Sequence, residues 1–369
     1  MTTAIVPSRR ALRINPDPLA MVLSRALRAF EELIDPVATP ISTGLINETY
    51  GVRDRENREF ILQRVSPMFS RGINHNIAAV TRHLTERGVD TFELIENDGL
   101  PYVDLGSDGL WRLMTRIEGV AFDRPENAEQ LRAAGRLVAS FHRALLDYDA
   151  ELNPIGFPYH DTGQHLEELA LALRECEEHP LHAETVELAN KIFDAAAGLP
   201  SLDKVPHRVI HGDLKFNNLL FEPVGSSADY QPIALIDLDT LARLPLAFDW
   251  GDALRSWCNL RSEDDPEAEL DLTLVEAATE GLMTVFDAGS PIDKPTPAEL
   301  DSLSWGLEIV SLELSARFAA DTLLERHFDW DRKRFERAGE HNHQRALGQF
   351  DLYRQARATH DRRGQLLAG

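Results

Sequence analysis

Cysteine is scarce in this chain of 369 residues: Cys176 and Cys258 are the only two, and they lie far apart in the sequence. Two isolated thiols can form neither a disulfide framework nor a thiolate zinc site, so a reducing cytoplasm is the expected compartment. No run of 18 apolar residues occurs, which argues against a membrane span. Residues 1–20 lack the apolar core of a signal peptide and are expected to form a loose N-terminal extension.

Positive charge is also in short supply. Lys and Arg number 38 against 61 Asp and Glu, a net charge of −23. A nucleic-acid partner needs a basic surface, so none is expected, whereas a cationic small molecule would be tolerated or attracted. Hydrophobic residues make up 43% and charged residues 27%, as in an ordinary globular protein, and the length is sufficient for two lobes with separate cores.

The apolar periodicity changes along the chain. Strand-like alternation dominates residues 39–65 and returns at 111–117, with helical spacing before and between these stretches. After Glu118 and Gly119 the pattern is mainly helical, apart from a buried-strand run at 232–239. This order predicts an α+β fold, with a strand-rich N-terminal lobe at 21–117 and a helical C-terminal lobe at 118–369.

The stretch HGDLKFNN places polar side chains between two apolar segments. Asp213 and Asn218 are five residues apart and His211 stands two before the aspartate, the spacing of the kinase catalytic loop H-R-D-x-x-x-x-N. In such a loop the aspartate accepts a hydroxyl proton and the asparagine oxygen binds a metal ion. His211 is expected to hold the loop by hydrogen bonds, with direct contact to substrate as the alternative.

A second acidic motif follows at the end of the run PIALIDLD. Asp237 and Asp239 supply the further carboxylates that a magnesium site requires, because Mg²⁺ prefers carboxylate and amide oxygens. Each motif alone is weak evidence, since HGD is common in turns and IDLD often only ends a strand. Together, in this order and beside apolar strands, they indicate phosphoryl transfer.

These motifs resemble those of the choline-kinase and aminoglycoside-phosphotransferase superfamily, whose members are relatives of protein kinases. The resembling segments are HGDLKFNNLLF, ALIDLDT and AFDWGDALR. GLINETYGV, FILQRV, WRLMTRIEG and LELSARFAADTL further resemble bacterial N-acetylhexosamine 1-kinases, in the same order and over residues 40–350. The resemblance implies a protein-kinase-like bilobal fold, with a small β-rich N-terminal lobe and a larger, mostly α-helical C-terminal lobe.

The resemblance also implies roles for individual residues, with ATP and Mg²⁺ as cofactors. Asp213 would be the catalytic base, and Lys215 would neutralise the transferred phosphate, or else be a solvated loop charge. Asn218 and Asp237 would hold Mg²⁺, with Asp239 nearby. Residues 43–49 would form a phosphate-covering hairpin and residues 114–118 an adenine-contacting hinge. The implied nucleotide contacts are Thr43, Gly44, Asn47 and Thr49 in the hairpin, Met114, Arg116 and Glu118 in the hinge, and Gln63.

Two features depart from the kinase pattern. The G-x-G-x-x-G motif is absent, and Gly44 is the only glycine in residues 40–50. Gln63 stands where kinases place the lysine of V-A-I-K, and a glutamine amide can hydrogen-bond a phosphate but carries no charge. Arg64 is adjacent, but strand alternation points it to the other face. The N-acetylhexosamine kinases also read I-L-Q here, so we interpret Gln63 as a feature of that branch.

Acceptor-site candidates come from two helical segments. Residues 299–324 carry a predicted buried stripe that includes Arg317, which would either shape the acceptor pocket or pair with Glu313 and Asp321. Asp252 and Arg255 would either bind sugar hydroxyls or pair with each other, and Asp249 would support the catalytic loop. The segment 326–337 is expected to be a solvated helix face.

The sequence therefore predicts an ATP- and Mg²⁺-dependent kinase for a small-molecule hydroxyl. The expected acceptor is the anomeric hydroxyl of an N-acetylhexosamine or related hexose, which would give a sugar 1-phosphate. The alternatives are an aminoglycoside, choline or ethanolamine phosphotransferase, and a nucleotide-binding pseudokinase without activity. Unpaired carboxylates at the acceptor site would favour a cation, and a mixture of donors and acceptors would favour a sugar.

Overall fold

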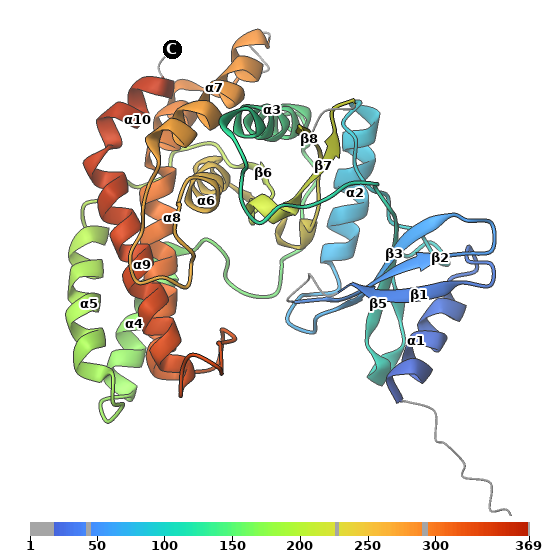
Figure 1. Cartoon of the computed structure of the whole chain (residues 1–369), viewed down its shortest axis with the longest axis horizontal. Coiled ribbons are helices and arrows are strands. Elements are labelled where there is room, and N and C mark those ends of the chain that lie inside the picture. The colour runs from blue at the N-terminus through green and yellow to red at the C-terminus, as the bar shows by residue number, and fades with distance from the viewer. Residues whose placement is uncertain (1–17, 42–45, 226–228, 290–293, 368–369) are drawn as a thin grey trace, which may run out of the picture. The chain divides into compact units, whose positions relative to one another are not determined.

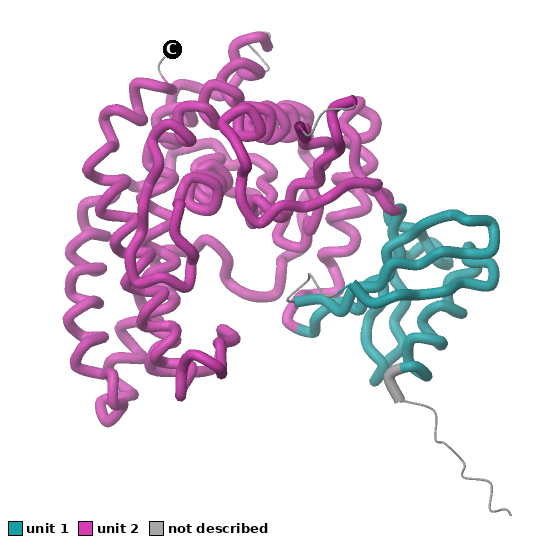
Figure 2. The backbone as a smooth tube through the Cα atoms, viewed as in Figure 1, with its two compact units in different colours: residues 1–67, 94–115 teal, residues 68–93, 116–369 magenta. Residues whose placement is uncertain are grey.

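The chain forms two compact units, one built on an antiparallel sheet and one made mainly of helices. A computed structural model describes residues 18–41, 46–225, 229–289 and 294–367. Contacts divide it into two units, residues 1–67 with 94–115 and residues 68–93 with 116–369 (Figures 1 and 2). The predicted residues Thr43 and Gly44, and residues 1–17 of the predicted extension, lie outside the described part of the chain.

The first unit is a five-stranded sheet with one helix on a face. The strands run in the order β1-β2-β3-β5-β4, and neighbouring strands are antiparallel. Their bounds are Val37–Ile41 for β1, Glu48–Arg53 for β2, Glu59–Val65 for β3, Val103–Asp104 for β4 and Leu110–Thr115 for β5.

Alternation along these strands explains how the sheet packs. Tyr50, Leu62 and Trp111 are buried together with Phe30 in one apolar cluster beside helix α1 (Pro18–Ala29). Because successive side chains of a strand point to opposite faces, the residues between them lie on the face away from α1. That opposite face carries Thr49, Gln63, Arg112 and Met114.

The second unit is mainly helical. Its helices are α2 (Ile73–Glu86), α3 (Ala128–Ala144), α4 (Thr162–Glu175), α5 (His182–Ala196), α6 (Ala247–Trp257), α7 (Leu272–Ala288), α8 (Pro297–Leu324), α9 (Ala338–Ala358) and α10 (His360–Leu367). Two antiparallel strand pairs complete it: β6 (Arg208–Ile210) with β9 (Ala242–Leu244), and β7 (Leu219–Pro223) with β8 (Tyr230–Leu235).

Helix α2 belongs to the second unit, whereas the sequence-based division placed it in a lobe spanning 21–117. Its apolar face packs against α3 and the short 3₁₀ turn Leu238–Thr240. Asn76 also exchanges hydrogen bonds with the backbone of Asn153, at 2.9 and 2.8 Å. The boundary after Thr115 lies close to the expected one at residue 117.

Helix α8 runs through the centre of the helical unit, with α4, α5, α6 and α9 packed against it (Figure 1). Most of the predicted stripe is buried, but residues on the other sides of the helix are buried as well, including Glu308 and Glu313. A helix surrounded by others needs no solvated face. It approaches α6 closely: a Cβ added at Gly306 would lie 2.2 Å from the Ala247 carbonyl oxygen.

The segment 326–337 is a loop, so the prediction of a helix face was wrong. The Asp321 carboxylate accepts hydrogen bonds from the backbone N–H groups of Arg326, His327 and Phe328, at 2.9–3.0 Å. These bonds cap the end of α8, and Glu325 adopts a left-handed conformation there with φ of 50°. No helix in the described part of the chain is long and apolar enough to cross a membrane.

Candidate active site

The two sequence motifs meet at the β7–β8 strand pair. Leu219 pairs with Leu235, and the Ile236 N–H donates to the Asn218 carbonyl oxygen at 2.9 Å. Asn218 and Asp237 therefore sit at adjacent ends of neighbouring strands. Asp237 has φ of 63°, a left-handed conformation that turns the chain directly after β8. The register thus brings together two of the predicted metal-binding residues.

His211 links these two motifs from below the surface. It is fully buried, and its Nε2 lies 2.9 Å from the Ile236 carbonyl oxygen, which can only accept a hydrogen bond. Nε2 must therefore carry the proton, and Nδ1 accepts from the Asp213 N–H at 3.3 Å. With both ring nitrogens engaged inside the protein, these contacts support the loop-holding role predicted as the first alternative.

Asp249 anchors the same loop from α6. Its two carboxylate oxygens accept hydrogen bonds from the N–H groups of His211 and Gly212, each at 2.7 Å, and the residue has no exposed surface. Gly212 has φ of 88°, and a Cβ there would lie 2.6 Å from the Thr240 carbonyl oxygen, so only glycine fits. The predicted supporting role of Asp249 agrees with these contacts.

Asp213 lies at the exposed edge of this frame, with 17% of its side chain accessible. Lys215 Nζ donates to Asp213 Oδ2 at 3.1 Å, and Asn218 Nδ2 donates to the Asp213 carbonyl oxygen at 2.8 Å. Burial lowers the pKa of Lys215, but Asp213, Glu263 and Asp252 raise it, and the net shift is upward. Lys215 therefore carries a positive charge beside the predicted catalytic base.

The donor set suits a magnesium ion that is shared with a phosphate. The Asn218 Nδ2 bonds to Asp213 turn its amide oxygen away from Asp213, and Asp237 is exposed at the adjacent strand end. Asp239 is only 2% exposed. Within the described residues no group of three or more His, Cys, Asp or Glu side chains is arranged to hold a metal. Mg²⁺ commonly binds through one or two carboxylates plus substrate phosphates, and these residues fit that mode.

Asp252 and Arg255 form a buried ion pair on α6. Arg255 Nε and Nη2 donate to Asp252 Oδ1 at 2.9 and 2.8 Å, and Nη1 donates to Glu263 at 2.8 Å. Burial lowers the pKa of Arg255, but the two carboxylates together raise it by more than burial lowers it, so the net shift is upward. The second Asp252 oxygen is buried and has no hydrogen-bond partner among the described residues. It is a free acceptor in an otherwise charge-paired cluster.

Arg317 makes neither of the ion pairs that its spacing suggested, within the described residues. Its guanidinium lies over the rings of Tyr159 and Phe328, at 5.9 and 5.5 Å from their centroids. Glu313 instead faces His160, and Asp321 caps α8. Arg317 is thus a partly buried cation stacked between two aromatic rings.

Tyr159 and His160 are site residues that the sequence reasoning missed. The Tyr159 hydroxyl and His160 Nε2 both lie within hydrogen-bonding distance of the Gly212 carbonyl oxygen, at 2.6 and 3.0 Å. Burial, with Asp213 and Asp252 next in effect, raises the pKa of Tyr159 well above its usual value, so the phenol stays protonated. No motif marks these residues, because they lie in an irregular segment, 53 and 52 positions before Gly212.

In the sheet unit, Gln63 bridges two strands. Its Nε2 donates to the Thr49 hydroxyl at 3.2 Å, and its Oε1 accepts from Arg112 Nε and Nη2 at 2.9 and 2.6 Å. Arg112, which stands directly opposite Gln63 in the β3–β5 register, was not predicted as a site residue. It places a buried positive charge next to the uncharged Gln63.

The remaining predicted nucleotide contacts also lie in or next to this unit. Asn47 Oδ1 accepts from the Ser66 N–H at 2.9 Å, which ties the start of β2 to the end of β3. Met114 is buried opposite Ile61, whereas Arg116 and Glu118 are exposed on the segment that follows β5. Arg64 pairs with Glu48 at 2.8 Å on the neighbouring strand.

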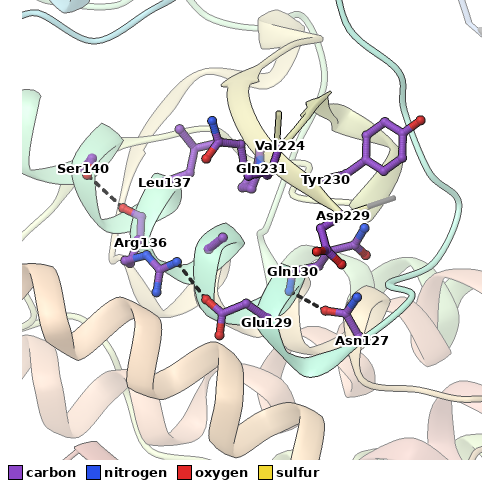
Figure 3. Close-up of a pocket in the computed structure, with 12 residues that line it drawn as sticks. Asn127, Glu129, Gln130, Arg136, Leu137, Ser140, Val224, Asp229, Tyr230 and Gln231 are labelled. Carbon is purple, nitrogen blue, oxygen red and sulfur yellow. Dashed lines mark hydrogen bonds and ion pairs between the residues drawn. The ribbon is translucent and has the colours of Figure 1, made fainter. Parts of the chain in front are cut away.

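A pocket of about 470 Å³ lies elsewhere in the helical unit, between α3 and the β7–β8 hairpin. Figure 3 shows its lining, which includes Glu129, Arg136 and Tyr230 but none of the predicted site residues. Arg136 bonds to Glu129 at 3.1 Å and Asn127 caps α3, so its polar side chains are largely engaged with one another. We assign this pocket no part in the site described above.

Comparison with known proteins decides the family. The model described as the phosphotransferase enzyme family (APH) matches residues 37–282, two thirds of the chain. The chain belongs to the phosphotransferase enzyme family. The match spans the catalytic-loop motif and both aspartates of IDLD, so the expected superfamily is confirmed.

Solved structures share the fold at low sequence identity. An aminoglycoside phosphotransferase from Alicyclobacillus acidocaldarius is 15% identical with a TM-score of 0.57, covering 98% of each chain. The amicoumacin kinase hAmiN, in complex with AMP-PNP, Ca²⁺ and Ami, is 14% identical (TM-score 0.58; 91% of this chain, 96% of that one). A microcompartment-associated aminopropanol kinase is 16% identical (TM-score 0.58; 94% and 98%). The predicted α+β, protein-kinase-like fold is confirmed.

Replacing Asp249 by Asn should destabilise the protein. An amide offers one acceptor oxygen, so one of the two buried N–H groups of His211 and Gly212 would face an N–H donor, at a cost of about 1–3 kcal/mol. Urea denaturation measures the loss in free energy of unfolding. Asp194→Asn, exposed on α5, is the matched control and should stay within about 0.5 kcal/mol. Equal effects of the two substitutions would contradict this account.

Proposed function

We propose that this protein transfers the γ-phosphate of ATP to the anomeric hydroxyl of an N-acetylhexosamine or a related hexose, giving a sugar 1-phosphate. The observation that carries the phosphoryl-transfer part is the Asp213–Asn218 hydrogen-bonded pair, held at the strand end next to Asp237. A phosphoryl-transfer site needs a base, a metal-binding pair and fixed positions, and these three residues supply them.

Each residue has a distinct task in this proposal. The Asp213 carboxylate accepts the proton of the acceptor hydroxyl and orients its oxygen, and the Lys215 ammonium offsets the negative charge of the transferred group. Asn218 Oδ1 and the Asp237 carboxylate would hold Mg²⁺, with Asp239 beside them. When bound, Mg²⁺ would neutralise charge on the phosphate oxygens of ATP.

Several carboxylates in this region are already paired, and this supports a neutral polyhydroxyl acceptor. Asp252 and Glu263 are paired with Arg255, and Glu313 is paired with His160 and Thr162. A quaternary or primary amine would need carboxylates that are not already neutralised. The second oxygen of Asp252, which is buried and has no hydrogen-bond partner among the described residues, would suit a sugar hydroxyl, since hydroxyls donate a hydrogen bond without charge.

A kinase for an aminoglycoside, choline or ethanolamine is the second candidate. The net charge of −23 favours a cationic acceptor. The similar solved structures include an aminoglycoside phosphotransferase and an aminopropanol kinase, whose names denote amine acceptors. The stacked cation Arg317 disfavours this candidate, because it would repel a positively charged ligand bound nearby.

ADP release from Mg-ATP tests the proposal directly. Purified protein is offered N-acetylglucosamine, N-acetylgalactosamine, glucose, galactose, kanamycin, choline, ethanolamine or no acceptor. We expect turnover with an N-acetylhexosamine. Turnover with kanamycin, choline or ethanolamine alone would replace this acceptor by the cationic class. ATP binding without turnover on any acceptor would support the pseudokinase alternative.

Asp213→Asn should lower kcat by on the order of 10²- to 10⁴-fold, the usual contribution of a general base. ATP affinity should stay near the wild-type value, because Asp213 is assigned to the acceptor hydroxyl. Asn218→Ala should weaken Mg²⁺ binding, so that half-maximal activity requires a higher Mg²⁺ concentration. Its neighbour Asn217, exposed on the same loop, gives the matched control Asn217→Ala, which should behave like wild type. A wild-type kcat in the Asp213→Asn variant would exclude Asp213 as the base.

Arg112 is proposed to supply the charge that Gln63 lacks at the kinase lysine position, for the phosphates of ATP. Arg112→Met should weaken ATP binding by on the order of 10- to 100-fold, as expected for hydrogen bonds to a charged group. Adenosine binding, which involves no phosphate, should change little, and this also reports that the variant is folded. Arg64→Met, on the other face, is the control. Equal losses for ATP and adenosine would rule the role out.

A further inference from the structure

Two side chains converge on one backbone oxygen beside the predicted catalytic base. The Gly212 carbonyl oxygen lies 2.6 Å from the Tyr159 hydroxyl and 3.0 Å from His160 Nε2. Gly212 directly precedes Asp213, and its N–H is already held by Asp249. The Gly212–Asp213 peptide unit is also held at its own N–H, which donates to His211 Nδ1 at 3.3 Å, so side chains fix it at both its C=O and its N–H.

The surroundings of His160 determine its protonation. Nε2 faces a carbonyl oxygen, and Nδ1 lies 3.0 Å from Glu313 Oε1, so both ring nitrogens face acceptors. A neutral imidazole has only one N–H and can satisfy one of these contacts. With Glu313 ionised, both are satisfied only when His160 is an imidazolium. His160 and Glu313 are 7% and 2% exposed, so water cannot readily substitute for a missing bond.

Other groups around the pair favour the same charge state. On the His160 side, Asp252 adds a further negative charge, and the ring stacks on Phe248 at 4.9 Å. On the Glu313 side, the Thr162 hydroxyl donates to Oε2 at 2.8 Å, and His165 and Arg317 lie close enough to stabilise the carboxylate. Both pair members are thus enclosed by partners of complementary kind from α4, α6 and the catalytic loop.

We propose that His160, as an imidazolium paired with Glu313, is a positioning residue that holds the Gly212 carbonyl and thereby aims the Asp213 carboxylate. This inference rests on the proposed kinase function, in which Asp213 is the base. His160 touches neither reacting group, and it acts through the peptide unit before Asp213. Tyr159 donates to the same oxygen but does not titrate in the neutral range.

The arrangement makes the position of Asp213 sensitive to pH. Burial lowers the pKa of His160, but Glu313 and Asp252 raise it, and the net shift is above the ordinary value. Burial raises the pKa of Glu313, but His160 lowers it, and the net shift is downward. The charged pair is therefore complete below the His160 pKa and is lost as the pH rises through it. Above that pH, the remaining ring proton stays on Nδ1, where it faces the Glu313 carboxylate, so the Nε2 lone pair faces the Gly212 carbonyl oxygen and that hydrogen bond is lost.

Variants of Glu313 separate the charge from the hydrogen bonds. In Glu313→Gln, the amide N–H can donate to Nδ1 of a neutral His160, its oxygen can accept from Thr162, and Nε2–H still donates to Gly212. Glu313→Leu removes the partner of His160 Nδ1 and the partner of the Thr162 hydroxyl. We expect kcat to fall on the order of 10- to 100-fold in Glu313→Leu and only a few-fold in Glu313→Gln, with the KM for ATP unchanged in both.

The pH profile of kcat distinguishes positioning from simple stability. The wild type should lose activity toward high pH as His160 deprotonates, and Glu313→Gln should not show this decline, because its His160 is neutral throughout. Tyr159→Phe, the control at the same oxygen, should lower kcat yet keep the wild-type pH profile. Equal kcat losses in Glu313→Gln and Glu313→Leu, or an unchanged decline in Glu313→Gln, would overturn the proposal.

Nitrogen NMR of histidine-labelled, full-length protein gives a readout that needs no activity. The His160 signals are identified by their absence in His160→Phe, and at neutral pH they should show both ring nitrogens protonated. A neutral His160 at that pH would overturn this inference while leaving the proposed function standing. Lack of turnover by the wild type with every acceptor would count against the proposed function instead.

Discussion

The carboxylate of Asp249, buried on α6 and accepting two backbone N–H groups of the catalytic loop, is the interaction on which the site depends. It fixes His211 and Gly212, and through them the start of the segment that carries Asp213 and Asn218. Helix α6 is itself fixed, because Gly251 and Gly306 let its backbone touch that of α8. The order of the loop therefore derives from packing of the central helices.

Helix α8 also reaches the loop by a second route. Glu313 on α8 binds His160, and His160 lies against the Gly212 carbonyl, so α8 supports Gly212 at its C=O as well as, through α6 and Asp249, at its N–H. Buried charges are tolerated there because each has a partner: Arg255 has Asp252 and Glu263, and His160 has Glu313. Charge pairing in this region also gives the proposed acceptor site both positive and negative groups, despite the large negative net charge of the chain.

Local signals in the sequence were sufficient for part of this account. The α+β fold follows from the order of strand-like and helical periodicity, and the approach of Asn218 to Asp237 follows from motifs that flank one hairpin, where register is set over a few residues. His160, Glu313 and Arg112 could not be assigned in the same way, because each acts through a partner that is distant in sequence. The burial of residues on every side of α8 was also missed, since a helix surrounded by others has no polar face to reveal its orientation. The end of α8 at Leu324 agrees with the predicted helical stretch 299–324, but the charged segment 326–337 that follows resembles a helix face and was mistaken for one.

The central claim is that this frame moves a phosphate from ATP to the anomeric oxygen of a sugar. Phosphorus NMR of a reaction containing the protein, Mg-ATP and N-acetylglucosamine tests it most directly, because it identifies the bond that forms. We predict ADP together with a new phosphomonoester whose phosphorus couples to the anomeric proton. A product coupled to another sugar position, or inorganic phosphate in place of an ester, would contradict the account.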